Sequence, residues 1–132
     1  MKTVNRYTSN EFHDWQRENL PGQIVIQDID AWALVVSTSE PLALIELKRS
    51  SIPPEAWMPF AADQPNYVAL LALARRANLP LWVVYFQMGQ PITDDSVFAL
   101  FELHEASPEY DGIRRLITAA DFAKRFPYVF GP

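Results

Sequence analysis

Short apolar runs rich in β-branched and aromatic residues constrain the fold of this chain more than any other feature. They are QIVIQDIDAWALVVS at residues 23–37, LALIELK at 42–48, LWVVYFQ at 81–87 and VFALFELH at 97–104. Runs of this kind are typical of strands, and the first is expected to form two strands with a bend or bulge near Asp28 to Asp30. No segment reaches the roughly 18 consecutive apolar residues that a membrane span needs. The chain is therefore expected to fold around a sheet.

Three segments with helical patterns lie before, between and after these strands. A first helix is expected from about Asn10 to Leu20, because Phe12 and Trp15 fall at helical spacing and Thr8 and Glu11 have the spacing of a capping box. A last helix is expected near residues 119–126.

A middle helix is expected at about Gln64 to Asn78. Asp63 is its expected N-cap, and Pro65 is tolerated in the first turn. From residue 67 to 74 the only polar side-chain group is the hydroxyl of Tyr67, so this helix is expected to pack on more than one side.

The chain of 132 residues is long enough for one core and too short for two ordinary domains. The expected fold is therefore a single α/β domain over residues 1–132, with a mixed central sheet flanked by helices. Its expected order is α-β-β-β-α-β, followed by an extra strand and a C-terminal helix. The chain has no cysteine, which excludes disulfides and thiolate metal sites and fits a cytoplasmic protein.

The strand at 42–48 begins apolar on both faces and ends in charged residues, which is how a buried strand emerges at a site. Side chains alternate faces along a strand, so Glu46 and Lys48 project from the same face. Asp28 and Asp30 obey the same rule upstream, and a hairpin could bring them close. The simpler interpretation of Glu46 and Lys48 alone is a solvent-exposed strand end.

These residue types suit the hydrolysis of a phosphodiester. Asp30 and Glu46 can hold Mg²⁺, with Mn²⁺ as a substitute, and the main-chain carbonyl of Leu47 is a candidate third ligand. Asp28 is the alternative to Asp30 as the metal aspartate. Lys48 can orient or deprotonate the attacking water and stabilise the developing negative charge.

At this point the chain resembles the PD-(D/E)XK nuclease superfamily, over roughly Glu11 to Gln87. The motifs that carry the resemblance are D-I-D at Asp28 to Asp30, I-E-L-K at Ile45 to Lys48, and Gln64 with Tyr67 at the start of the middle helix. The family has a restriction-endonuclease-like core, and it includes Holliday-junction resolvases and RecB-like and Cas4-like exonucleases.

The resemblance implies a role for each residue that it matches. Asp30 and Glu46 would be metal ligands, Lys48 the catalytic lysine, Glu11 a further acidic residue and Gln64 the helix glutamine of the RecB-like branch. The chain departs from that branch in placing Tyr67 three positions after Gln64 rather than four, and it has Ile29 where the motif has proline. Outside the resemblance, Glu11 has an alternative role as the capping partner of Thr8.

The expected partner is nucleic acid, with DNA favoured, and the net charge of −5 argues against this expectation. Four basic pairs are candidate phosphate contacts: Lys48 with Arg49, Arg75 with Arg76, Arg114 with Arg115, and Lys124 with Arg125. A homodimer or a targeting partner protein is also expected, because one of the apolar strands at 81–87 and 97–104 is expected at a sheet edge. The four tryptophans are expected to pack rather than to stack on bases.

Two function classes compete on this evidence. The first is a Mg²⁺-dependent deoxyribonuclease. The second is a non-catalytic binding or assembly module that retains the nuclease fold, which the acidic net charge favours. A further alternative is an unrelated small α/β domain in which the match to the motifs is accidental.

Overall fold

The computed structural model describes residues 11–12, 14–15, 18–22, 29–59, 63–104, 113–126 and 128–130. The strands in these ranges form one mixed sheet of five strands in the order β1-β2-β3-β4-β5. The strands are β1 (Ala31–Leu34), β2 (Pro41–Ser50), β3 (Leu81–Gln87), β4 (Val97–Leu103) and β5 (Arg115–Thr118). Two α-helices, α2 (Gln64–Ala77) and α3 (Ala119–Arg125), and the 3₁₀ helix η2 (Tyr128–Phe130) accompany the sheet.

The pairing pattern places β2 and β3 side by side at the centre of the sheet. β1 and β2 form an antiparallel pair, whereas β2 and β3 run parallel because the chain returns through α2 between them. β3, β4 and β5 then pair antiparallel. In the parallel pair, Lys48 lies opposite Tyr85 and Ser50 lies opposite Gln87.

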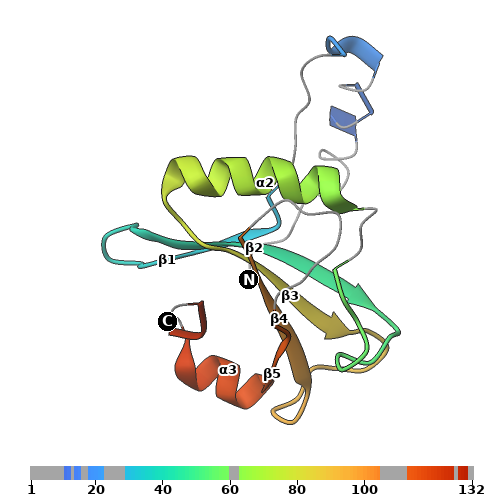
Figure 1. Cartoon of the computed structure of the whole chain (residues 1–132), viewed down its shortest axis with the longest axis vertical. Helices are drawn as coiled ribbons and strands as arrows, with labels where there is room; N and C mark the ends of the chain where they lie inside the picture. Colours follow the sequence, from blue (N-terminus) through green and yellow to red (C-terminus); the bar gives the residue numbers. More distant parts are fainter. Residues whose placement is uncertain are drawn as a thin grey trace.

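The two faces of the sheet carry different helices, as Figure 1 shows: α2 covers one face, and α3 lies on the other. Alternate residues of the strands build a core on each face. The core under α2 contains Val83, Tyr85 and Phe101, and the core on the α3 face contains Trp82, Val84 and Leu100. The alternate residues of β2, which are Leu44, Glu46, Lys48 and Ser50, therefore lie on the α2 face.

The helix α2 packs on one face, which corrects the expectation that it packs on several sides. Tyr67, Leu70, Leu71 and Ala74 are buried against the sheet, whereas Val68 and Leu73 are exposed. The helix ends at Asn78, which takes the left-handed conformation and donates its main-chain N–H to the carbonyls of Ala74 and Arg75. None of the helices in the described ranges has the length and apolarity that a membrane crossing requires.

The observed element order differs from the expected one. The ordered elements run β-β-α-β-β-β-α, and β5 is a strand that the sequence did not predict. β5 has only four residues and begins with a charged arginine, so it depends on pairing with β4 rather than on its own apolar pattern. The expected strand at 23–28 lies outside the described residues. The described residues between Glu11 and Asn19 are helical, as expected.

The strands on which the homodimer prediction depends do not lie at an edge of the described sheet. β3 has β2 and β4 as neighbours, and β4 has β3 and β5. The expectation that one of them lies at an edge is therefore wrong, because β5 covers β4. The homodimer itself stays a prediction without this support.

Trp57 is the aromatic centre of the core under α2. Its side chain is 2% exposed, stacks on Tyr85 at a centroid distance of 4.4 Å and meets Phe101 edge-on at 5.4 Å. Its carbonyl also accepts hydrogen bonds from the guanidinium of Arg114 at 3.0 and 3.2 Å. Trp82 is buried as well, whereas Trp15 and Trp32 are about half exposed.

Replacing Trp57 by Ala should lower the free energy of unfolding by about 3–5 kcal/mol, the usual cost of removing a buried large aromatic side chain. The measurement is urea unfolding followed by circular dichroism. Trp32→Ala is the matched control, because Trp32 is 51% exposed and its loss should cost much less. Equal losses in the two variants would contradict the assignment of Trp57 as the core residue.

Candidate metal centre

The C-terminal half of β2 brings Glu46 against Asp30. Asp30 directly precedes β1, and its Oδ2 accepts a hydrogen bond from the main-chain N–H of Leu47 at 3.0 Å. This bond fixes the aspartate beside β2, and its carboxyl group shares a side-chain hydrogen bond with that of Glu46. Glu46 is 7% exposed and is the buried charged residue of the described chain.

Lys48 projects from the same face of β2 as Glu46, as strand alternation predicts. Its Nζ lies 3.7 Å from Glu46 Oε1 and 3.5 Å from Asp63 Oδ2. The ammonium also lies 5.8 Å from the centre of the Tyr67 ring. The three side chains that the sequence pattern grouped together, Asp30, Glu46 and Lys48, are thus adjacent in the structure.

The start of α2 contributes two residues that the sequence analysis did not assign to the site. Asp63 is at the N-cap position, but its side chain makes no capping hydrogen bond and instead faces Lys48. The expected capping role of Asp63 is therefore wrong. Asn66, one turn further on, makes a side-chain hydrogen bond with Glu46. Both are polar residues at the start of the helix that follows the I-E-L-K strand. This position is the feature of the sequence that could have indicated their part in the site.

The surroundings of Glu46 raise its pKa to about 7. Burial is the largest cause, and the hydrogen bond and negative charge of Asp30 act in the same direction. The positive charge of Lys48 and the hydrogen bond of Asn66 oppose the rise. The Glu46 carboxyl group is therefore much easier to protonate near neutral pH than an ordinary glutamate.

Tyr67 supplies an observation that is independent of the carboxylates. Its side chain is 7% exposed, and its hydroxyl is buried with no hydrogen-bond partner among the described residues. Burial raises the pKa of this phenol, and the charges of Asp63 and Glu46 add to the rise. A buried hydroxyl without a partner is costly.

The donor set fits a hard divalent cation. Asp30 and Glu46 present carboxylate oxygens side by side, and Mg²⁺ needs only one or two protein carboxylates because it keeps several waters. Within the described ranges, no three His, Cys, Asp or Glu side chains gather into a metal-holding group. The fit is therefore to a two-carboxylate site rather than to a closed metal cage.

The other predicted site residues lie around this pair or outside the description. Glu11 is helical and exposed, and its catalytic role stays a prediction. Gln64 begins α2, but its side chain is not among the described ones, and Asp28 lies outside the described residues. Leu47 donates its N–H to Asp30, while the ligand role of its carbonyl stays a prediction.

Comparison with models of known protein families, with curated proteins and with solved structures gives no match to this chain. The case for a function therefore depends on the geometry of the site itself.

The raised pKa of Glu46 predicts a stability that falls as the pH rises. The Glu46 carboxyl group has a higher pKa in the folded state than its usual 4.5, so the folded state binds its proton more tightly. The resulting stabilisation is fully present below pH 4.5 and is lost as the pH rises through about 7. Without metal, the wild-type chain should therefore lose up to about 3 kcal/mol between pH 5 and pH 8.

The variant Glu46→Gln should show little of this loss, because it keeps the shape and removes the charge. The measurement is urea unfolding in EDTA at the two pH values, with Glu40→Gln, an exposed site, as the control. Parallel pH profiles of wild type and Glu46→Gln would contradict the assignment of this titration to Glu46.

Proposed function

We propose that this chain is a metal-dependent nuclease that hydrolyses DNA phosphodiester bonds. The observation that carries the proposal is the placement of Lys48 within 3.7 Å of Glu46 at the point where Glu46 meets Asp30. Two carboxylates and an ammonium at one end of a strand suit a metal-assisted attack of water on a phosphate.

Each residue has a distinct part in this proposal. Asp30 and Glu46 hold Mg²⁺ or Mn²⁺, which when bound polarises the phosphoryl oxygens and lowers the pKa of water. Lys48 orients the attacking water and stabilises the negative charge that develops on the phosphate. Asp63 positions the Lys48 ammonium from the opposite side, and Asn66 orients the Glu46 carboxyl group through its amide.

The connectivity supports a restriction-endonuclease-like core. An antiparallel pair, β1 and β2, carries Asp30, Glu46 and Lys48, and α2 then crosses to the parallel strand β3. This arrangement has the strand-strand-helix-strand order that the resemblance to PD-(D/E)XK nucleases implies for that part of the chain.

The test is cleavage of linear, nicked, branched and single-stranded DNA by the purified chain, with and without Mn²⁺, with an RNA strand as a further substrate. Lys48→Ala should reduce cleavage by on the order of 10²-fold or more while the fold is retained, because a transition-state contact is lost. Lys124→Ala is the matched control, because Lys124 is exposed on α3.

Glu46→Ala should behave differently from Lys48→Ala. It removes a metal ligand, so cleavage and Mn²⁺ affinity should fall together, whereas Lys48→Ala should keep most of its Mn²⁺ affinity. Wild-type cleavage by Lys48→Ala at saturating Mn²⁺ would make the non-catalytic binding module the better account.

A further inference from the structure

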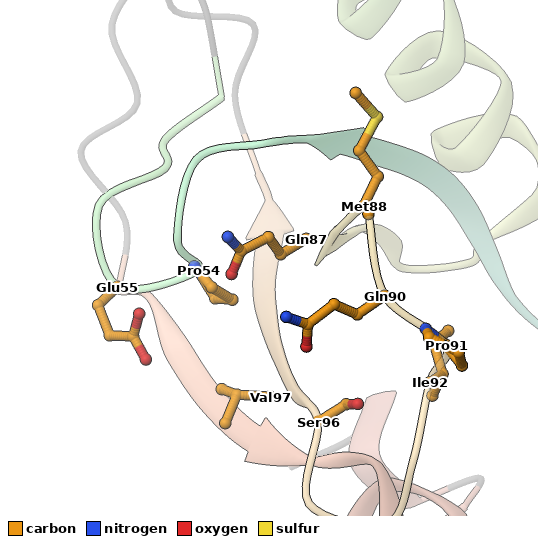
Figure 2. Close-up of a pocket in the computed structure, with 10 residues that line it drawn as sticks. Pro54, Glu55, Gln87, Met88, Gln90, Pro91, Ile92, Ser96 and Val97 are labelled. Carbon is orange, nitrogen blue, oxygen red and sulfur yellow. The ribbon is translucent and has the colours of Figure 1, made fainter.

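A pocket lies beyond the ends of β2 and β3, and three segments of the chain line it. It has a volume of about 350 Å³, and its wall includes Pro54, Gln87, Gln90 and Val97. Figure 2 shows the amide groups of Gln87 and Gln90 directed into the same space, with Pro54 and Val97 beside it. This volume is near the lower end of the range for small-molecule sites, so the pocket accommodates one planar group rather than a helix or a duplex.

Hydrogen bonds hold the walls of this pocket in place. Gln87 donates its amide N–H to the carbonyl of Ser51 at 3.0 Å, and the main-chain N–H of Met88 donates to Ser50 at 2.9 Å. On the opposite wall, Ser96 accepts from the N–H of Thr93 at 2.9 Å and from that of Ala119 at 2.7 Å. The pocket is therefore formed before any ligand arrives.

The chemistry of the lining selects a neutral ligand with amino groups. Among the described residues of the lining, Glu55 is the only ionisable side chain, and its negative charge disfavours a phosphate there. The amide nitrogen of Gln87 donates one of its two hydrogens to Ser51, and the Gln87 amide oxygen and the Glu55 carboxylate are two acceptors in the lining. Pro54, Met88, Ile92 and Val97 supply apolar surface. Acceptors beside an apolar surface match the amino group and the flat face of adenine, cytosine or guanine.

The position of the pocket relates it to the candidate metal centre. Gln87 pairs with Ser50, two residues beyond the pairing of Tyr85 with Lys48. Two residues along a strand cover about 7 Å. A DNA strand rises about 3.4 Å per nucleotide in a duplex, so this offset along the strand between Lys48 and the pocket residue Gln87 corresponds to about two nucleotides.

We propose that this pocket binds an unstacked amino-bearing nucleobase, adenine, cytosine or guanine, of the strand whose phosphate lies at Lys48. The inference deepens the proposed nuclease function and depends on it for the phosphate. Because a base must leave the stack to enter, the preferred substrate has a single-stranded or splayed strand at the cleavage site.

The first experiment tests the pocket without any cleavage. Two-dimensional NMR spectra of the full ¹⁵N-labelled chain in EDTA are recorded with millimolar deoxyadenosine, deoxycytidine or thymidine. The side-chain amide signals of Gln87 and Gln90 should shift with the first two nucleosides and less with thymidine. The variant Gln90→Trp, which fills the pocket, should lose the shifts.

The matched control is Val36→Trp, which adds the same side chain at an exposed position in the turn before β2. It should keep the shifts. Absence of shifts at Gln87 and Gln90 in the wild-type chain, or an equal shift of the Gln87 signal in Gln90→Trp, would overturn the proposal whether or not the chain cleaves DNA.

The second experiment distinguishes a base in a strand from a free nucleoside. A single abasic site is moved along a single-stranded oligonucleotide, and cleavage is followed with Mn²⁺. An abasic site at one position within two nucleotides of the cleaved bond should slow cleavage by on the order of 10-fold, the usual effect of losing one base contact. Gln90→Trp should cut the intact strand equally slowly.

Cleavage that is insensitive to every abasic position would overturn the strand-bound base while leaving the nuclease function intact. If the chain cleaves no DNA, the nuclease function fails, and the nucleoside spectra still decide whether the pocket binds an amino-bearing base.

Discussion

The burial of the Glu46 carboxyl group is the constraint on which the rest of the site depends. A carboxylate taken out of water needs a proton, a cation or strong hydrogen bonds, since the charged form is otherwise disfavoured. The structure surrounds Glu46 with groups that meet this need: Asp30 and Asn66 make side-chain hydrogen bonds with it, and Lys48 supplies positive charge. These groups come from the segment before β1, from β2 and from α2, so the site exists only when the three segments are packed together.

The first turn of α2 shows how the site takes precedence over local stability. A helix N-cap aspartate ordinarily accepts a main-chain N–H, and this interaction is usually worth about 1 kcal/mol. Asp63 makes no such bond, and its carboxylate lies 3.5 Å from the Lys48 ammonium instead. The buried hydroxyl of Tyr67, one turn further along the helix, is a second local cost, and the centre of its ring lies 5.8 Å from the same ammonium. Local rules are broken together at one place, which is typical of functional sites.

Much of the fold and the central part of the site could be predicted from the sequence. The strands at 42–48, 81–87 and 97–104 and the helix at 64–78 follow from apolar patterns, and the bounds of β2, β3, β4 and α2 agree closely with them. The same-face placement of Glu46 and Lys48 follows from strand alternation alone. Their proximity to Asp30 needs the β1–β2 hairpin, which the short separation of the two segments indicated.

The remaining features depend on tertiary contacts that no local pattern encodes. Asp63 and Asn66 join the site only because the first turn of α2 lies over the end of β2. β5 is too short and too charged to be recognised without its partner β4. The pocket is formed by loops that the sequence indicated only as turns, and its shape depends on hydrogen bonds between segments distant in the chain.

The hydrogen bonds of the arginines relate the acidic net charge of the chain to the mode of binding that we propose. Three of the basic residues considered as phosphate contacts already donate to main-chain carbonyls: Arg75 to His104, Arg114 to Trp57, and Arg115 to Val129. Their hydrogen bonds hold the fold together, which leaves less of the positive surface that usually binds nucleic acid. If the proposed function holds, attraction of the phosphate in a chain with a net charge of −5 would depend mainly on Lys48 and on a cation bound by Asp30 and Glu46. Neutral contacts to a base would supply what long-range electrostatics does not, and this is the kind of contact that the pocket beside Gln87 offers.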